Sequence, residues 1–147
     1  MEIRDVIFRI EQERKEQNAI YHAAAAKFGL TDSALWAFYC ISKSDEDQTQ
    51  QDLCRRGCYA KQTINTAIAG LAKDGLVELI PVPVPGTRNC KKIHLTPNGR
   101  ALADRTARPL KAAEEQAYGR LSEAELSAYL QTLGKLNEYL REETEKL

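Results

Sequence analysis

The chain has 147 residues, about the size of one domain, with 43% hydrophobic residues, 29% charged residues and a formal net charge of zero. This composition supports a hydrophobic core in a soluble protein. The sequence contains no apolar run long enough for a transmembrane helix, and its N-terminus lacks the pattern of a signal peptide. We therefore expect a cytoplasmic protein with no membrane partner.

The charges are distributed unevenly along the chain. Residues 1–54 carry a net charge of −4, residues 55–100 a net charge of +6, and residues 111–147 a net charge of −3. A basic segment between two acidic ones indicates a local surface for binding a nucleic acid. The net charge of zero for the whole chain does not reveal this segment. A solvated charged surface is the alternative explanation.

The first part of the chain has the pattern of two helices. Apolar residues recur at three- and four-residue spacing from Ile3 to Ile10, and helix formers continue to residue 28. Gly29 is expected to end this helix, and Thr31 is expected to cap the next. The second helix is apolar on nearly every side, which predicts that it is buried.

A helix-turn-helix is predicted to follow. Thr49 and Asp52 resemble a capping box at the start of a short helix that Gly57 interrupts. A longer helix, KQTINTAIAGLAKDG, ends at Gly75. Its predicted buried face consists of Ile64, Ile68 and Leu71. Two helices joined by a short turn that contains glycine are typical of this motif.

A small β-wing is expected next. LVELIPV has the alternation of a strand, PVPVPGTRN is an extended loop, and CKKIHL is a second strand. Thr96 and Pro97 then have the N-cap and first-turn residues of a new helix. Residues 97–118 are predicted to form one helix, in which Pro109 predicts a kink or a break.

The last helix begins with a capping box formed by Ser122 and Glu125. An apolar stripe then runs along one of its faces, through Leu126, Leu130, Leu133, Leu136 and Leu140. The stripes of the terminal helices have little other sequence to cover them. A symmetric dimer would bury them, although packing on the same chain is an alternative.

In this order the elements resemble the MarR family of winged-helix transcriptional regulators. The stretches that carry the resemblance are TQQDLCRR (49–56), KQTINTAIAGLAKDGLVEL (61–79), GTRNCKKIHLTPNGRAL (86–102) and LSEAELSAYLQTLGKLNEYL (121–140). The resemblance implies a homodimer that binds palindromic operator DNA. In the family, binding usually represses nearby genes and is often relieved by a small aromatic ligand or by thiol oxidation.

The resemblance also implies the fold. We expect a single MarR-like domain over residues 1–147, mainly α with a small two-stranded β-wing. Residues 31–96 would form the winged helix-turn-helix reading head. Residues 1–30 and 97–147 would supply the dimerisation helices.

The predicted DNA contacts lie on the second helix of the reading head and on the wing. Gln and Asn can pair with adenine, Thr can contact a thymine methyl group or a phosphate, and Lys suits a phosphate. On the helix these residues are Lys61, Gln62, Thr63, Asn65 and Thr66. On the wing, Arg88 suits a narrow minor groove, and Lys91 and Lys92 suit phosphates. An ordinary polar helix face is the alternative.

The cysteines raise the question of a metal or redox site. Cys54 and Cys58 are spaced C-x3-C and only two histidines exist, so no metal site and no cofactor are predicted. Basic neighbours favour a reactive thiolate, so a redox switch is the alternative trigger, with Cys58 the more exposed candidate. Cys54 is expected to pack as a small apolar residue.

A ligand pocket and one further function complete the expectations. Tyr21, His22, Trp36 and Tyr39 lie in the helices that line the pocket in the family, although core packing would explain them as well. A winged-helix protein-interaction module remains a further possibility. No nucleophile–base pair or phosphate-binding loop is recognisable, so no enzyme is predicted.

Overall fold

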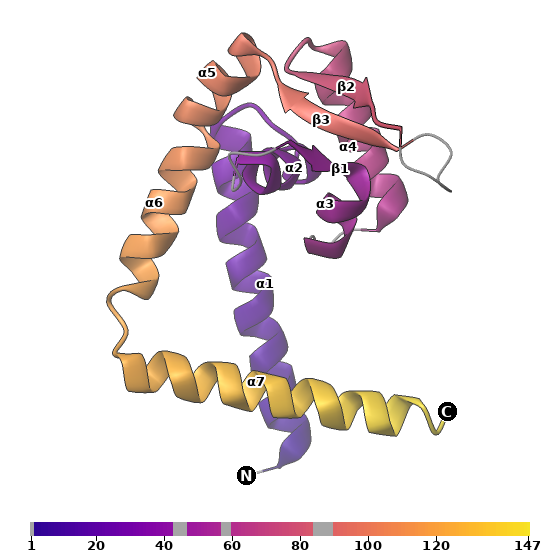
Figure 1. The fold of residues 1–147 in the computed structure, drawn as a ribbon. Coiled ribbons are helices and arrows are strands. Elements are labelled where there is room, and N and C mark those ends of the chain that lie inside the picture. The colour runs from indigo at the N-terminus through magenta and orange to yellow at the C-terminus, as the bar shows by residue number, and fades with distance from the viewer. Residues whose placement is uncertain (1, 43–46, 57–59, 84–89) are drawn as a thin grey trace. The chain divides into compact units, whose positions relative to one another are not determined.

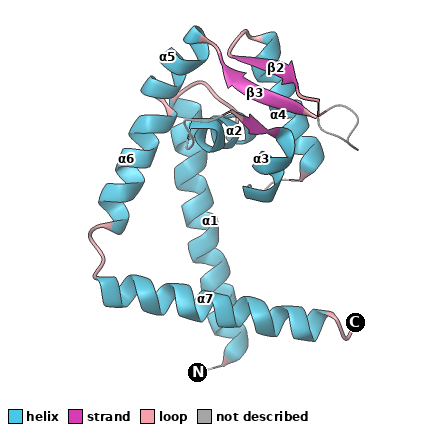
Figure 2. Ribbon diagram, viewed as in Figure 1, coloured by secondary structure: helices cyan, strands magenta, loops and turns pink. Residues whose placement is uncertain are grey.

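The computed structural model describes residues 2–42, 47–56, 60–83 and 90–147 (Figure 1). The chain divides into two compact units, Met1–Leu110 and Lys111–Leu147. The elements are α1 (Ile3–Lys27), α2 (Asp32–Ser42), β1 (Gln48–Thr49), α3 (Gln50–Arg56), α4 (Lys61–Lys73), β2 (Val77–Pro81), β3 (Lys91–Leu95), α5 (Pro97–Arg105), α6 (Ala107–Tyr118) and α7 (Glu123–Thr144). Helices and one small sheet make up the described chain (Figure 2), which confirms the predicted mainly α winged helix-turn-helix fold.

Helix α1 ends at the predicted glycine through a Schellman motif. Gly29 has a φ of +70°, a value that glycine adopts without strain. Its amide donates to the carbonyl of Ala26 at 3.0 Å, and the amide of Leu30 donates to the carbonyl of Ala25 at 2.9 Å. These two bonds satisfy carbonyls that the helix end would leave without donors.

Helix α2 is the central helix of the first unit. The hydroxyl of Thr31 accepts a hydrogen bond from the amide of Ala34 at 3.2 Å, as predicted for an N-cap. The helix buries Leu35, Ala37, Phe38, Tyr39, Cys40 and Ile41. The core around it includes Leu53 of α3, Ile64 and Ile68 of α4, and Ile93 of β3. The expected burial of this largely apolar helix is confirmed.

The sheet has three strands rather than the predicted two. Its order is β1-β3-β2, with both pairs antiparallel. β1 is a two-residue strand in which Gln48 pairs with Ile93 and Thr49 pairs with Lys92. Gln48 is buried, and its side-chain Nε2 donates to the backbone carbonyl of Cys40 at 3.2 Å. A strand of two residues is too short to show the alternation of apolar and polar residues by which a strand is predicted from sequence. It is recognised only by its pairing with β3.

The predicted single helix over residues 97–118 is two helices. The chain breaks at Thr106, where φ is −128° and ψ is −75°. Pro109 lies in the first turn of α6, where an amide hydrogen would have no acceptor within the helix. The proline therefore begins a new helix instead of bending an existing one. The predicted break near Pro109 is confirmed, whereas the prediction of one helix over residues 97–118 is wrong.

In the second unit, α7 begins with the predicted capping box. Ser122 Oγ accepts from the amide of Glu125, and Glu125 Oε2 accepts from the amide and the hydroxyl of Ser122 at 2.8 and 2.7 Å. The hydrogen bond from the Ser122 amide, followed by that from the hydroxyl, lowers the pKa of Glu125 below its ordinary value. The charged carboxylate is therefore the form that the cap stabilises.

The apolar stripes of α1 and α7 are largely uncovered in the single chain. Leu130 and Leu140 of α7 are 68% and 49% exposed, and Ile3 of α1 is 70% exposed. No residue of α7 is buried. Within the described residues, no helix combines the length and the apolarity needed to cross a membrane.

Candidate nucleic-acid interface

Helix α4 places a polar face outward because its opposite face belongs to the core. Ile64, Ala67, Ile68 and Leu71 are buried. With 3.6 residues per turn, the residues farthest from this buried face are Gln62, Thr66, Ala69 and Lys73. All four are exposed. Gln62 and Thr66 of the predicted DNA contacts thus lie at the centre of the outward face.

The other predicted residues of α4 differ in exposure. Lys61 is exposed at the helix start, whereas Thr63 and Asn65 are half-buried. The Oδ1 atom of Asn65 is buried and has no hydrogen-bond partner among the described residues. The Thr66 hydroxyl donates to the carbonyl of Gln62 at 2.9 Å and keeps its methyl group free. The side chain of Asn65 is therefore less accessible than that of Gln62, which is exposed.

Two small residues and one lysine on the outward face of α4 were not predicted. Lys73 is exposed in the last turn. Ala69 and Gly70 are also exposed, and because their side chains are very small they do not protrude from the middle of the helix surface. A β-carbon at Gly70 would have no atom within 4 Å, so packing within the chain does not require glycine there. Extending the Gln62–Thr66 periodicity by two turns would have identified Lys73.

The N-terminus of α4 has no side-chain cap. Its N-cap residue is Ala60, with φ −60° and ψ 149°, and alanine has no side-chain oxygen that could accept from the first turn. The first amide groups of a helix have no acceptor inside it, and the helix dipole favours an anion there. This end of α4 therefore suits a DNA phosphate.

The wing brings further cations to the reading head. Lys91 and Lys92 are exposed on β3, while the next residue, Ile93, is 1% exposed and anchors the strand in the core. Lys92 lies opposite Thr49 of β1 and Ile80 of β2. Arg88, the predicted minor-groove residue, lies outside the described residues.

The cysteines fall into two groups. Cys40 is buried, and Cys54 and Cys90 are half-buried. Cys54 packs against the core cluster. Cys58, the predicted redox residue, lies outside the described residues. In the described part of the chain, no group of three or more His, Cys, Asp or Glu side chains could hold a metal ion.

Three of the four predicted pocket residues form an aromatic cluster. The ring centroids of Tyr21 and Trp36 are 5.4 Å apart, and those of Trp36 and Tyr39 are 5.3 Å apart. These distances are typical of packed aromatic pairs. His22 instead binds Asp32, with Nδ1 2.9 Å from Oδ1. The cluster therefore joins α1 to α2 through ring packing.

These features define a winged helix-turn-helix protein. Its second motif helix, α4, has a polar outward face, and the adjacent wing carries lysines. Residues 28–86, which include the helix-turn-helix and the first wing strand, match the model of the MarR family. No curated protein matches the sequence.

Several solved structures share the fold. NMB1585, a MarR family regulator from Neisseria meningitidis, is 15% identical, with 95% of this chain and 96% of that chain covered and a TM-score of 0.77. The M. tuberculosis regulator MosR is 21% identical, with 90% and 95% covered and a TM-score of 0.63. Bordetella bronchiseptica BpsR, whose DNA binding is regulated by 6-hydroxynicotinic acid, is 18% identical, with 88% and 98% covered and a TM-score of 0.63.

The family match covers residues 28–86, which is most of the reading head, and the shared fold covers nearly the whole chain. The chain therefore resembles the MarR family in residues 28–86 and shares the fold of MarR family regulators over nearly its whole length.

Proposed function

We propose that this protein is a homodimeric, sequence-specific DNA-binding repressor that a small-molecule effector releases. The observation that carries the proposal is the outward face of α4. Its exposed Gln62 and Thr66 are backed by a fully buried Ile64 and Ile68, so the polar face is held rigidly against the core. A rigid helix with exposed amide and hydroxyl groups is suited to read base edges in a major groove.

The cations around α4 support a phosphate-binding role. Among the described residues, Lys61 lies at the helix start, Arg55 on α3, and Lys91 and Lys92 on β3, all of them exposed. Phosphate contacts fix the register of a protein on DNA without reading its sequence. Such contacts release counterions, so binding would weaken steeply as salt increases.

A homodimer would explain the exposed apolar stripes. Leu130, Leu140 and Tyr129 of α7 and Ile3 and Ile7 of α1 are exposed in the single chain. A second copy that covers these residues would remove their apolar surface from water. It would also present two copies of α4 to two half-sites about one helical turn apart.

The effector part of the proposal rests on a relative and on an aromatic cluster of this chain. The Bordetella bronchiseptica relative is described as regulated in its DNA binding by 6-hydroxynicotinic acid. In this chain, the cluster of Tyr21, Trp36 and Tyr39 offers aromatic surface for a planar ligand. The thiol switch at Cys58 remains an alternative trigger, and a comparison of peroxide-treated wild type with Cys58→Ser would test it.

The test is DNA binding by fluorescence anisotropy at several salt concentrations. The DNA would be the promoter upstream of the protein's own gene, with random DNA of equal length as the reference. Gln62→Ala should reduce affinity for the promoter by about ten- to a hundredfold and affinity for random DNA little, because the substitution removes a base-reading amide. Gln17→Ala, an exposed change in the middle of α1, is the matched control. Equal affinity for both DNAs at low salt would refute sequence-specific recognition.

A further inference from the structure

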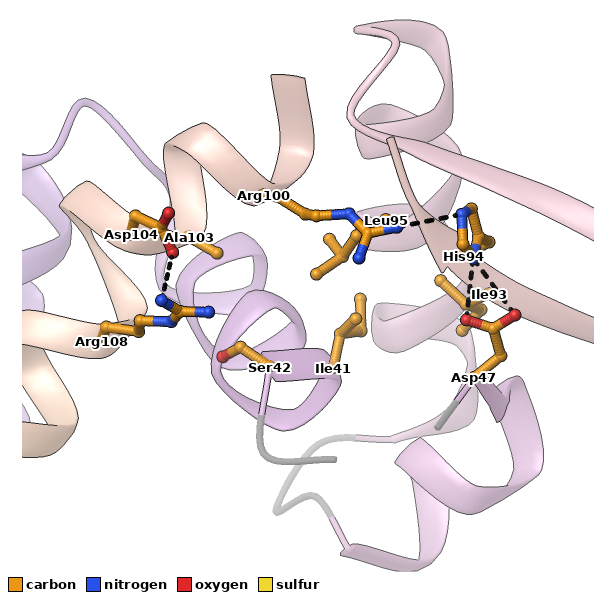
Figure 3. A pocket seen from close by; sticks show the side chains of 10 residues that line it. All are labelled: Ile41, Ser42, Asp47, Ile93, His94, Leu95, Arg100, Ala103, Asp104 and Arg108. Atoms are coloured by element: carbon orange, nitrogen blue, oxygen red, sulfur yellow. Dashed lines mark hydrogen bonds and ion pairs between the residues drawn. The ribbon is translucent and has the colours of Figure 1, made fainter. Parts of the chain in front are cut away.

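Strand β3 carries a histidine whose two ring nitrogens face groups of opposite charge (Figure 3). Nδ1 of His94 lies 2.9 Å from Oδ1 and 3.2 Å from Oδ2 of Asp47. Nε2 of the same ring lies 3.4 Å from Nη2 of Arg100. The three side chains come from the segment before β1, from β3 and from α5, and they line part of a hollow of about 150 Å³. The histidine therefore connects a carboxylate to a guanidinium.

The sheet places this histidine in a row of charged side chains. β1 pairs Gln48 with Ile93 in antiparallel register, so Asp47 continues the row opposite His94. On the other side, β2 places Glu78 opposite His94. Residues directly opposite each other in an antiparallel pair are close enough to interact. His94 is therefore flanked by a carboxylate on either side along the sheet.

Further charged groups surround the ring from α5, α6 and β3. Asp104 and Arg108 line the same hollow and pair with each other, with Oδ1 and Nη1 3.0 Å apart. Lys92 lies two residues before His94 and so on the same face of β3. The lining residues that α2 supplies are uncharged. Among the described residues, only the carboxylate and the guanidinium named above lie within hydrogen-bonding distance of the ring nitrogens.

The protonation state of the ring decides whether Arg100 can stay beside it. The nitrogen that faces the carboxylate carries a hydrogen, so the neutral ring has its lone pair on Nε2 and accepts an N–H of the guanidinium there. The guanidinium is always charged. A second proton on Nε2 would turn the acceptor into a donor and place one cation 3.4 Å from another. The protonated ring would therefore keep Asp47 and repel Arg100.

We propose that Asp47, His94 and Arg100 form a pH-sensitive latch between wing strand β3 and helix α5. The neutral His94 ring holds Arg100 on Nε2. Protonation of the ring releases Arg100, while the bond to Asp47 remains. Histidine is the side chain that ordinarily changes its charge between about pH 5 and pH 8, so mild acidification opens the latch.

The latch acts on the strand that carries the wing lysines. Lys91 and Lys92 lie on β3 with His94, and Arg100 lies near the start of α5. Opening the latch removes a contact between this strand and the helix that follows it. A resulting pH dependence of DNA binding rests on the proposed function, whereas the latch itself does not.

The chain contains a matched control in its other histidine. Nδ1 of His22 lies 2.9 Å from Oδ1 of Asp32, the same distance as in the pair of His94 and Asp47. Within the described part of the chain, no guanidinium lies within hydrogen-bonding distance of the His22 ring. His22 therefore has the carboxylate without the arginine, and its protonation should leave Arg100 unaffected.

The test is NMR of the full chain without DNA at about pH 8 and about pH 5, on either side of the ordinary histidine transition. At the higher pH, the His94 ring should carry its hydrogen on Nδ1, and the Nε–H bond of Arg100 should be ordered. At the lower pH, the order parameter of that bond should fall below about 0.6, the range of flexible groups.

Three variants separate the latch from a general effect of pH. His94→Gln keeps an uncharged acceptor, so Arg100 should remain ordered at both pH values. His94→Lys carries a charge at both pH values, so Arg100 should be mobile at both. His22→Gln should respond as wild type does. Circular dichroism checks that each variant folds.

The proposal is overturned if the order parameter of Arg100 in wild type is the same at both pH values, or if the neutral His94 ring carries its hydrogen on Nε2. It is also overturned if Arg100 loses order on acidification of His94→Gln, stays ordered in His94→Lys, or stops responding in His22→Gln. If the His94 variants do not fold, the two wild-type measurements decide. Because no DNA is present, a failure of promoter recognition is distinct from a failure of the latch.

Discussion

The hydroxyl of Thr96 donates a 2.6 Å hydrogen bond to the carbonyl of Gly75, and the same oxygen accepts from the amide of Gly99 at 3.0 Å. The amide of Thr96 also donates to the carbonyl of Leu76 at 3.1 Å. Gly75 and Leu76 form the turn after α4, and Gly99 is in the first turn of α5. One threonine therefore joins the end of the candidate DNA-reading helix to the helix that follows the wing.

Thr96→Val should destabilise the protein by about 1–3 kcal/mol, because it removes the N-cap of α5 and the bond to Gly75 together. Urea unfolding followed by circular dichroism measures the change. Thr144→Val is the matched control, since the Thr144 hydroxyl bonds only to carbonyls of its own helix, those of Leu140 and Arg141. A loss no larger than that of the control would mean that the link to Gly75 contributes nothing.

Gly99→Ala should also destabilise the fold, by about 1–3 kcal/mol, because a β-carbon there would overlap the carbonyl oxygen of Leu76. That oxygen belongs to the backbone and cannot rotate away. Gly70→Ala is the opposite case, with no atom within 4 Å of the added carbon. It should stabilise α4 by up to about 1 kcal/mol. Thermal unfolding of both variants without DNA measures the contrast, and equal effects would contradict the close approach at Gly99.

Lys92→Gln should reduce the slope of log affinity against log salt by about one for each phosphate that the lysine neutralises, and so by about two for a homodimer. Affinity for promoter and random DNA should fall by similar factors, since phosphates carry no sequence information. Anisotropy titrations at several salt concentrations give the slope. Lys27→Gln, at the end of α1, removes the same charge away from the reading head. A slope change in the control as large as in Lys92→Gln would rule out a localised phosphate contact.

Leu130→Glu should break the proposed dimer without unfolding the chain, because Leu130 is 68% exposed in the single copy. A charge buried between two copies is strongly unfavourable. Sedimentation velocity measures the shift from dimer to monomer. Gln131→Glu makes the same charge change on the adjacent, exposed residue of α7 and should leave the dimer intact. An unchanged dimer in Leu130→Glu would place the interface elsewhere.

The capping box of α7 should depend on pH. Because the pKa of Glu125 is lowered from 4.5 in the folded chain, its stabilising contribution is complete above that value. The contribution is lost as the pH falls through the folded pKa. The amide resonance of Ser122, followed by NMR on acidification, should report the loss. Glu125→Gln keeps an acceptor for Ser122 but cannot titrate, so the same pH response in that variant would refute the assignment.

Most of the helix boundaries could be predicted because their causes are local. Thr31, Thr96 and Ser122 each accept from the amide three residues later, so neighbouring residues contain the whole signal. Gly29 and Gly75 end their helices with positive φ for a similarly local reason. The exposure of Gln62 and Thr66 follows from the apolar period of α4 in the same way.

The remaining features depend on residues that are distant in sequence. β1 exists because Gln48 and Thr49 pair with β3, more than forty residues later. The half-burial of Asn65 and the hollow beside Arg100 depend on which elements pack together. Amino-acid order by itself determined most of the helix ends and the polar face of α4, since each arises within a few turns of chain. Only the tertiary structure decided the third strand and the position of Arg100 beside His94 and Asp47, because these require contacts between distant segments.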